Sequence, residues 1–251
     1  MRVFLTGASS GIGEALARHY CAQGAILGLV ARRAEPLETL RVSLGKPAET
    51  YIADVRDAAA LRAAAADFVA KHGVPDLVIA NAGISHGTLT EHAEDTEVFR
   101  RILDVNVIGM VNTFQPFLAA MRREGRGTLA GVASVAGFRG LPGAGAYSAS
   151  KAAAIKYLES LRVEMRGTGV KVATICPGYI ATPMTEKNPY PMPFIITAEE
   201  FARRFARAVE SGASFAVIPW QMAIVGRLLR LLPNALFDAA FARAGRKPRL
   251  K

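Results

Sequence analysis

The chain has 251 residues, of which 51% are hydrophobic and 21% are charged. This composition is typical of a packed globular protein and excludes a largely disordered chain. The net charge of +10 is unevenly spread, because the residues from 220 onward carry seven Lys or Arg against one acid, Asp238. A near-neutral body with a basic end argues against a general nucleic-acid-binding surface. We expect the last ten residues to form a solvated, partly disordered tail.

Cysteine and histidine usage indicates a reducing compartment and no metal site. The two cysteines, Cys21 and Cys176, lie far apart in the sequence and are typical of buried thiols rather than a disulfide framework. A strand-like run at residues 2–6 begins almost at the initiator methionine, so we expect no signal peptide and a cytoplasmic protein. No close metal-ligand spacing with cysteine or carboxylate is found for the four histidines, His19, His72, His86 and His92.

Short apolar runs alternate with longer helical patterns from the start of the chain. The expected strands are residues 3–6, 26–30, 51–53, 77–80, 128–133, 170–175 and 214–218. The expected helices are residues 12–23, 36–44, 58–71, 98–121, 148–166 and 198–210. This alternation predicts an α/β fold of the Rossmann type, with a doubly wound, mostly parallel seven-stranded sheet covered by helices on both faces. No linker interrupts it, so residues 1–219 are expected to form one domain.

The first expected strand leads directly into a glycine-rich turn and then a helix. The turn, residues 6–13, has the spacing G-x-x-x-G-x-G, with Gly7, Gly11 and Gly13 at the glycine positions. Glycines allow backbone to approach a diphosphate closely, and the helix N-terminus supplies free N–H groups and positive potential. In this strand–turn–helix context we predict a dinucleotide site; the alternative is a simple strand-to-helix turn.

Two further short stretches carry polar side chains suited to a reaction centre. Asn81-Ala82-Gly83 follows the fourth expected strand, where an asparagine can brace neighbouring loops across the top of the sheet. Tyr147 and Lys151 lie four residues apart, which places a phenol and an ammonium one helical turn apart on the same face. A cation beside the phenol favours its ionised form, so we expect the pKa of Tyr147 to be lowered.

Together these stretches resemble the short-chain dehydrogenase/reductase family, of the single-domain type of about 250 residues. Its motifs are matched in order and with its spacings over roughly residues 1–185. The matching residues are Thr6 to Gly13, Asn81 to Gly83, Asn106, Ser134, Tyr147 to Lys151, and Pro177-Gly178.

The resemblance implies a role for each of four residues. Tyr147 is the acid/base that protonates a carbonyl oxygen or takes the proton in the reverse direction, and Lys151 lowers its pKa and bonds the nicotinamide ribose. Ser134 holds the substrate oxygen, and Asn106 holds a water that links Lys151 to solvent. The alternatives are a capping Ser134, a core Tyr147 and a polar helix residue Asn106. Two alternative functions stay open: a cofactor-binding regulatory protein without turnover, and a membrane-surface reductase of lipid-derived carbonyls.

The second expected strand bears on the cofactor. NAD sites place an acid near its end, and in the family pattern that position falls on Ala31, followed by Arg32 and Arg33. A guanidinium suits a 2′-phosphate, so NADP(H) is favoured as the cofactor and NAD(H) stays an alternative. The alternative role of the two arginines is to begin an exposed helix without contacting the cofactor. By resemblance, Asp54 and Val55 flank the adenine, and the nicotinamide end is bound by Pro177, Gly178, Ile180 and Thr182. The other cofactor-binding residues that the resemblance implies are Gly7, Ser9, Ser10, Gly11, Ile12, Gly13, Arg32, Arg33, Asn81, Ala82, Gly83, Tyr147 and Lys151.

The substrate region carries no specific motif. Three prolines between residues 189 and 193 forbid helix and strand ladders, so residues 180–196 are expected to form a loop, either a lid over the site or an ordinary surface excursion. We predict a small-molecule carbonyl or alcohol substrate. His86 is either a pocket residue or a polar loop residue. Candidate apolar pocket residues are Phe138, Leu141, Tyr179, Met184 and Phe194.

The C-terminal extension, residues 220–251, is where the resemblance weakens, because many family members end soon after the seventh strand. It is assigned to the same domain. Charges and Pro233 exclude a transmembrane span. Three alternatives stay open: extra core or pocket wall, a dimer interface, or peripheral contact with a membrane surface. A homodimer or homotetramer is expected. The apolar stripe consists of Met222, Val225, Leu228, Leu229, Leu232, Leu236, Phe237 and Phe241.

Overall fold

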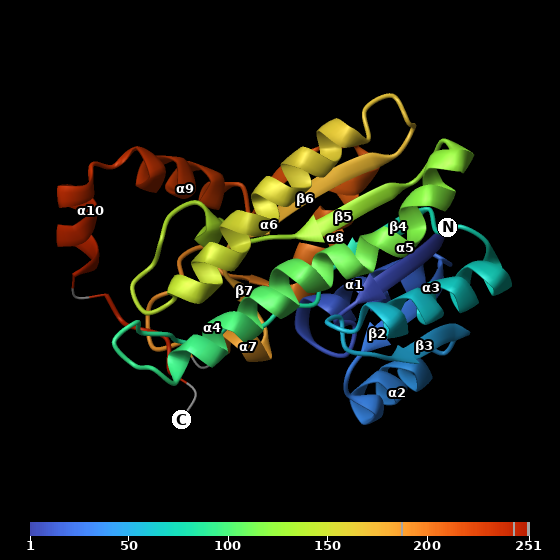
Figure 1. The fold of residues 1–251 in the computed structure, drawn as a ribbon, viewed down its shortest axis with the longest axis horizontal. Helices are drawn as coiled ribbons and strands as arrows, with labels where there is room; N and C mark the ends of the chain where they lie inside the picture. The colour runs from blue at the N-terminus through green and yellow to red at the C-terminus, as the bar shows by residue number, and fades with distance from the viewer. Residues whose placement is uncertain (187, 243, 250–251) are drawn as a thin grey trace.

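A sheet of seven parallel strands forms the centre of the molecule (Figure 1). The computed structural model describes residues 1–186, 188–242 and 244–249. Every neighbouring pair in the sheet is parallel, and the order is β3-β2-β1-β4-β5-β6-β9. This confirms the predicted doubly wound sheet, with its switch point between β1 and β4. The strands are β1 (Arg2–Thr6), β2 (Ile26–Ala31), β3 (Ala48–Ile52), β4 (Leu77–Ala80), β5 (Thr128–Val132), β6 (Lys171–Pro177) and β9 (Phe215–Ile218).

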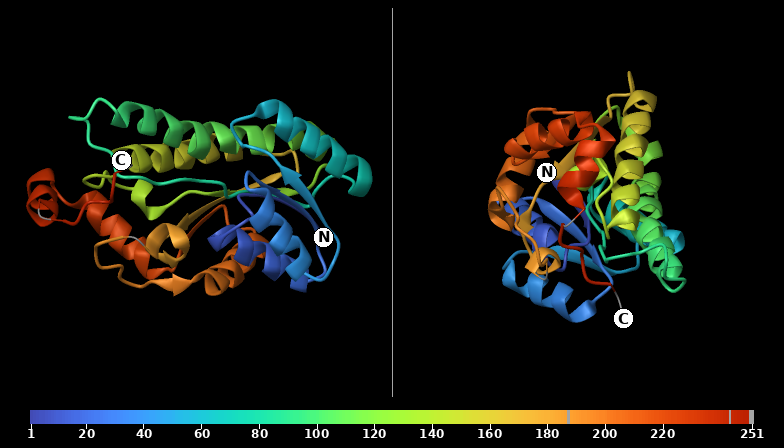
Figure 2. Two further views of the ribbon diagram at one scale, coloured as in Figure 1. Left: turned by 90° about the horizontal axis from the view of Figure 1, so that it is seen from below. Right: turned by 90° about the vertical axis from the view of Figure 1, so that its left-hand side faces the viewer.

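Helices cover both faces of the sheet, as the edge view shows (Figure 2). One face carries α1 (Gly11–Ala22), α2 (Ala34–Ser43) and α8 (Ala198–Glu210). The other carries α3 (Ala58–His72), α5 (Gly109–Glu124) and α6 (Gly145–Glu164). Strands buried on both faces read as continuous apolar runs, which is the pattern seen in the sequence.

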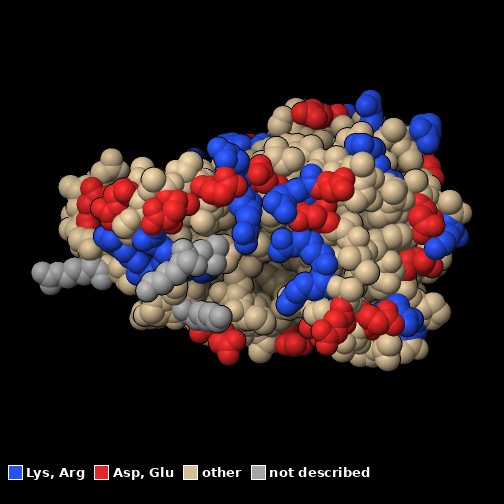
Figure 3. Space-filling model, turned by 60° about the horizontal axis from the view of Figure 1, so that its bottom comes forward, with Lys and Arg blue, Asp and Glu red and all other residues tan. Residues whose placement is uncertain are grey.

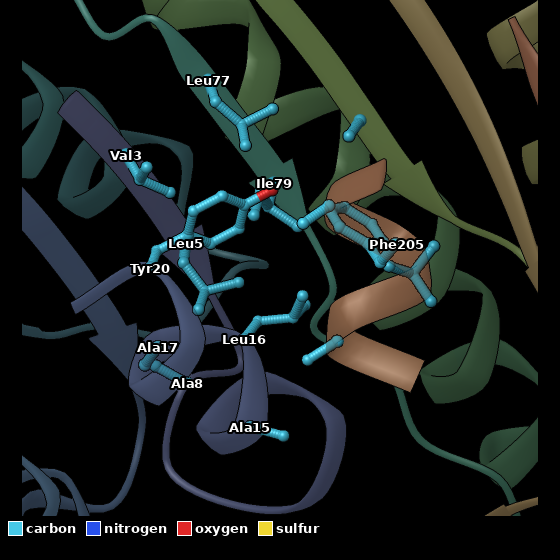
Figure 4. Close-up of a cluster of buried hydrophobic side chains, with 14 of the residues drawn as sticks. Val3, Leu5, Ala8, Ala15, Leu16, Ala17, Tyr20, Leu77, Ile79 and Phe205 are labelled. Carbon is cyan, nitrogen blue, oxygen red and sulfur yellow. The ribbon is translucent and has the colours of Figure 1, made fainter. Parts of the chain in front are cut away.

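Two hydrophobic cores hold these layers together. On the α1 side, Leu16, Tyr20 and Phe205 pack against Leu5 and Ile79 of the sheet (Figure 4). Burial of each large side chain of this kind contributes about 1.5–3 kcal/mol. On the other side, the fully buried rings of Phe4, Phe68, Phe114 and Phe117 form the centre of the second core.

The long helical stretch expected over residues 98–121 is interrupted. It consists of α4 (Asp95–Leu103), a π-helical turn η1 (Asp104–Ile108) and α5, which continues through Pro116. The stretch is long and apolar enough to cross a membrane, but Phe114 and Phe117 are wholly buried in the second core. This burial identifies the stretch as a helix of the protein core. The π turn carries Asn106, and such turns are frequent at functional sites.

The segment expected to be a loop, residues 180–196, is tied at its base. β7 (Ile180–Ala181) pairs in parallel with β8 (Ile196–Thr197), and α7 (Pro183–Glu186) lies between them. The pairing fixes where the segment leaves and rejoins the fold, so the irregular part of it is shorter than predicted. Residue 187 lies outside the described residues.

The chain continues beyond β9 as α9 (Gln221–Leu231) and α10 (Asn234–Phe241), which extend past the edge of the sheet (Figure 1). Residues 244–249, here called the C-terminal strap, then return to the loop after β4. The Gly87 amide donates to the Pro248 carbonyl at 2.9 Å. The expectation of a solvated tail is wrong for these six residues. Residues 243, 250 and 251 lie outside the described residues, and the assignment of residues 1–219 and 220–251 to one domain stays a prediction.

Candidate active site

The glycine-rich turn between β1 and α1 packs so closely that only glycine fits. Gly7 has a φ of +70°, and a Cβ there would lie 2.7 Å from the Cα of Ala82. A Cβ on Gly13 would overlap the Gly7 carbonyl oxygen. Positive φ values and this close approach explain the glycine spacing of the sequence. The turn presents the N-terminus of α1, with its free N–H groups, to the carboxyl edge of the sheet.

Asn81 braces this turn from the neighbouring strand. Its Nδ2 donates to the carbonyl oxygens of Thr6 and Gly7, both at 3.2 Å. The side chain thereby joins the carboxyl ends of β1 and β4 at the switch point, where ligands of doubly wound sheets bind. The bracing expected from the sequence is found in the structure.

A cleft of about 310 Å³ opens at this edge of the sheet, and the molecule is hollowed on this side, with Lys and Arg side chains along the rim (Figure 3). Of the predicted cofactor-binding residues, all except Asp54 line it. Its volume falls at the lower end of the range for ligand sites. Sequence reasoning missed several further lining residues, for which a position near the motif residues was the available signal: Val30, Ala53, Ile84, Val105, Val132, Ala133, Pro183 and Thr185.

Asp54 is engaged by arginines instead of lining the cleft. Its carboxylate accepts from Arg56 Nη2 at 2.8 Å and lies 3.7 Å from Arg32 Nη1. The hydrogen bonds from Arg56, followed by the charges of Arg56 and Arg32, hold the pKa of Asp54 below its usual range despite partial burial. The cleft wall beside it is formed by Ala53 and Val55.

Arg33 lies across the mouth of the glycine-rich turn. Its Nη2 donates to Ser10 Oγ at 3.3 Å and reaches Ser9 Oγ at 3.5 Å. These donors surround the place where β2 ends, and the residue at that end is Ala31 rather than an acid. Hydroxyls, a guanidinium and free helix N–H groups form a donor set that fits the phosphates of a dinucleotide.

The reaction-centre residues converge from β5 and α6. Ser134 follows β5 and caps the short 3₁₀ helix η2 (Val135–Gly137), its Oγ accepting from the Ala136 amide at 3.1 Å. Lys151 is 4% exposed, and its Nζ donates to the Val132 carbonyl at 2.8 Å and lies 5.8 Å from the centre of the Tyr147 ring. Ser134, Tyr147 and Lys151 all line the cleft.

Burial controls the protonation of this pair. It raises the pKa of Tyr147, while the hydrogen bond with Ser134 opposes the rise. Burial also lowers the pKa of Lys151 to about 8. The expected lowering of the Tyr147 pKa by Lys151 is therefore not found, because the ammonium is bound to a backbone carbonyl and desolvation outweighs the nearby charge.

Asn106 joins the loop after β4 to α6. Its Oδ1 accepts from the Ile84 amide at 2.8 Å, and its Nδ2 donates to the Ile84 carbonyl at 3.0 Å and to Ser150 Oγ at 2.9 Å. Asn106 is 1% exposed, and both the oxygen and the nitrogen of its side-chain amide form hydrogen bonds within the protein. Asn106 therefore positions Ser150, which precedes Lys151, and the side-chain amide has no N–H donor left for the expected water.

A second cavity, also of about 310 Å³, lies on the other side of Tyr147. It shares Ser134, Tyr147, Gly178, Met184 and Thr185 with the cleft. The expected pocket residues Leu141, Tyr179 and Met184 line it, and Ser85 lines it in place of His86.

Two expected pocket residues lie elsewhere. Phe138 stacks on Phe215, with ring centres 6.1 Å apart, and Phe194 is 50% exposed. The C-terminal segment contributes to the cavity wall through Phe241, Ala244, Gly245 and Lys247, as in the pocket-wall alternative, and sequence reasoning missed the last three of these residues.

Comparisons with known proteins agree with this arrangement. Residues 1–191 match the family model for short chain dehydrogenases. An uncharacterized oxidoreductase of Myxococcus xanthus is 40% identical over 242 residues, covering 95% of both chains. A short-chain dehydrogenase from Streptomyces avermitilis superposes with a TM-score of 0.81 at 26% identity, covering 96% of this chain and 97% of the other.

A variant of actinorhodin polyketide ketoreductase, solved with NADPH, superposes with a TM-score of 0.79 at 27% identity, covering 86% of this chain and 95% of that one. The fold, the family match and the relatives lead to the same assignment. This chain belongs to the short-chain dehydrogenase/reductase family and is an NAD(P)-dependent oxidoreductase.

Proposed function

We propose that this protein reduces a ketone or aldehyde to an alcohol with NADPH, using Tyr147 as the proton donor. One observation carries the proposal: the cleft lined by the predicted cofactor-binding residues and the second cavity meet at Tyr147 and Ser134. A nicotinamide in the cleft and a carbonyl in the cavity would then meet beside these two side chains.

The chemistry divides between the cofactor and the chain. When bound, NADPH supplies the hydride that adds to the carbonyl carbon. Ser134 Oγ accepts from the Ala136 amide, so its own proton is available to the carbonyl oxygen, where negative charge develops. Tyr147 then transfers its phenolic proton to that oxygen, which completes the alcohol. The tyrosinate left behind lies beside the Lys151 ammonium, which stabilises it until a proton returns from solvent.

The protonation state of Tyr147 bears on the direction of the reaction. Burial raises the pKa of Tyr147, so the phenol keeps its proton at neutral pH and is ready to donate it. Alcohol oxidation needs the opposite state, a tyrosinate that can accept a proton. The protonated phenol supports reduction as the favoured direction near neutral pH.

The residues at the end of β2 favour NADPH over NADH. An NAD site needs a carboxylate there to accept from the ribose hydroxyl, and Ala31 supplies none. Arg33, held by Ser9 and Ser10 at the cleft, is placed to bind a 2′-phosphate.

Members of this family act on small molecules and are commonly oligomeric. For this chain we propose a homodimer formed through the outer face of α9. That face carries apolar side chains that are 50–80% exposed at Trp220, Ile224, Leu228 and Leu231. An exposed apolar stripe of this kind marks an interaction surface. Residence in the cytoplasm stays a prediction.

The experiment is a panel of carbonyl compounds with NADPH, followed by loss of NADPH absorbance. Wild type should reduce at least one of them, and Tyr147→Phe should lower kcat by about 100-fold or more, because general acid catalysis contributes about 10²–10⁴-fold. Tyr157→Phe, on the same helix, removes an equivalent hydroxyl away from the cleft and is the matched control. Turnover that Tyr147→Phe leaves unchanged would contradict Tyr147 as the proton donor, and no turnover on any member would favour a cofactor-binding regulatory protein.

A further inference from the structure

The second cavity contains a cation that comes from the C-terminal strap. Lys247 Nζ donates to Ser85 Oγ at 2.9 Å and lies 5.9 Å from the centre of the Tyr147 ring. Lys247, Ser85, Ser134 and Tyr147 all line this cavity. An ammonium group therefore lies within a few ångströms of the place where a substrate carbonyl would react.

This ammonium has no acidic partner among the described residues. Within the described part of the chain, Lys247 takes part in none of the ion pairs within 4.0 Å. Of the described residues that line the cavity, it is the only charged one. Burial lowers its pKa. A half-buried cation without a counter-ion is costly unless a ligand supplies the opposite charge.

The acids nearest to the strap are already used by Arg249. Its Nε and Nη2 donate to Asp95 at 2.8 and 3.1 Å, and Nη2 also donates to Glu94 at 2.8 Å. Two adjacent acids thus neutralise Arg249, and Lys247 stays available to a ligand in the cavity.

The position of Lys247 is built into the fold rather than left to a free chain end. The Gly87 amide donates to the Pro248 carbonyl at 2.9 Å. A Cβ on Gly87 would overlap the Lys247 carbonyl oxygen, and one on Gly143 would lie 2.9 Å from Arg246 Cβ. Glycines on two separate loops therefore leave room for the strap at this place.

We propose that the substrate is an oxo acid, a carbonyl compound whose carboxylate binds Lys247 Nζ and Ser85 Oγ while its carbonyl oxygen binds Tyr147 and Ser134. The proposal rests on the proposed carbonyl reduction and specifies its substrate class. Lys247 acts as a specificity-determining residue and takes no part in proton transfer. The apolar remainder of the substrate packs against Leu141, Tyr179 and Tyr190, which also line the cavity.

The spacing limits the length of the acid. Each carbon–carbon bond spans about 1.5 Å and each hydrogen bond about 3 Å. Lys247 Nζ lies 5.9 Å from the Tyr147 ring centre, so a short acid, with only a few bonds between its carbonyl and its carboxylate, suits the two partners. The predicted substrates are therefore 2-, 3- and 4-oxo acids.

The experiment compares each oxo acid with its methyl ester, which keeps the carbonyl and the skeleton but removes the charge. We measure kcat/KM with NADPH for wild type, Lys247→Met, and the matched control Arg246→Met, which removes an equal charge from an exposed neighbour. Wild type and the control should prefer the acid by about 10- to 100-fold, the factor expected for hydrogen bonds to a charged group. Lys247→Met should lose that preference through a higher KM for the acid, with the ester unchanged.

Two results would overturn the proposal. One is a wild-type enzyme whose kcat/KM for the methyl esters equals its kcat/KM for the acids. The other is a Lys247→Met variant that loses acid and ester activity by the same factor, which would make Lys247 only a structural residue. Lys247→Glu adds a further readout, because it should reject the acid more strongly than Lys247→Met does.

A binding measurement separates this proposal from the proposed function. Calorimetry on the NADPH complex of the Tyr147→Phe variant compares hydroxy acids with their amides, with and without Lys247→Met. A carboxylate preference that depends on Lys247 supports the oxo-acid site even if no carbonyl is turned over. Turnover of neutral ketones, with no carboxylate preference in binding, supports the proposed function and overturns the oxo-acid site.

Discussion

The guanidinium of Arg249 donates to both carboxylate oxygens of Asp95, at 2.8 and 3.1 Å, although the two residues are separated by 154 positions in the sequence. Asp95 is 3% exposed and also accepts from the Leu89 amide at 2.7 Å. A paired geometry of this kind fixes direction as well as distance. It fastens the end of the C-terminal strap beside the second cavity.

Replacing Arg249 with Gln should release the strap. Without the paired hydrogen bonds, Lys247 is no longer held at the cavity wall. We expect faster trypsin cleavage after Arg246 and a higher KM for charged substrates, while the kcat for a neutral ketone stays near wild type. Arg100→Gln, which removes an exposed pair with Glu97 on α4, is the control. Unchanged cleavage in the Arg249 variant would show that backbone contacts alone hold the strap.

The pH dependence of reduction should report Lys151. Burial lowers the pKa of this ammonium to about 8 and raises the pKa of Tyr147. Reduction needs a protonated Tyr147 and a charged Lys151, and both conditions hold below pH 8. We therefore expect kcat/KM for reduction to be level near neutral pH and to fall above about pH 8 as Lys151 loses its proton.

Alcohol oxidation should show the opposite trend, since Tyr147 must then accept a proton and does so more readily as the pH rises. NADPH affinity measured over the same range separates catalysis from binding. A reduction rate that holds to pH 10 would show that Lys151 need not be charged.

Replacing Arg33 with Ala should weaken NADPH selectively. Its guanidinium bonds Ser9 and Ser10 at the cleft, and loss of hydrogen bonds to a charged group costs about 1.5–3 kcal/mol. The KM for NADPH should rise by about 10- to 100-fold, with the KM for NADH nearly unchanged. Arg41→Ala, on the outer side of α2 and paired with Glu38, is the control. Equal effects on both cofactors would contradict a role at the 2′-phosphate.

Arg139 should be required for the stability of the C-terminal helices. Its guanidinium donates to the Leu229 and Leu232 carbonyls at 2.9 and 2.7 Å, and to Asn234 Oδ1 at 2.8 Å. It also lies 4.2 Å from the centre of the Phe237 ring. Arg139→Met leaves the last carbonyls of α9 without this cap.

Urea denaturation of Arg139→Met should show a loss of about 1.5–3 kcal/mol, the value of hydrogen bonds to a charged group. Arg62→Met, at an exposed position of α3, should change the free energy of unfolding by less than about 0.5 kcal/mol. Equal effects of the two variants would show that the cap contributes nothing measurable.

The exposed face of α9 should determine the oligomeric state. Leu228 and Leu231 are 63% and 80% exposed, and a charge at either position disfavours burial against a second copy. Light scattering should give a dimer for wild type and a monomer for Leu228→Glu combined with Leu231→Glu. Wild-type protein that is monomeric yet sediments with anionic liposomes would instead favour peripheral membrane contact.

The fold and the reaction centre could be predicted from sequence because their signals are local. Gly7, Gly11 and Gly13 are imposed by the tight turn after β1, and their spacing is visible within seven residues. Tyr147 and Lys151 are joined by one turn of α6. Alternating apolar strands and helices follow from a sheet covered on both faces. Such features depend on neighbouring residues, so the chain itself displays them.

Other features depended on solvation and packing around each residue rather than on spacing along the chain. Asp54 forms hydrogen bonds with Arg56, a π turn interrupts the helix at Asn106, and burial raises the pKa of Tyr147, which was expected to be lowered. Each outcome depends on solvation and packing that no short motif records.

By itself, the sequence determined the sheet, the glycine-rich turn and the Tyr147–Lys151 pair, because periodicity and spacing are imposed within one or two turns of chain. Only the tertiary structure decided that residues 244–249 return to the active site and bring Lys247 to Ser85, 162 positions away. The physical reason is that this contact depends on the folded path of α9 and α10, on the Arg249–Asp95 pair and on the space left by Gly87. None of these acts at short range along the sequence.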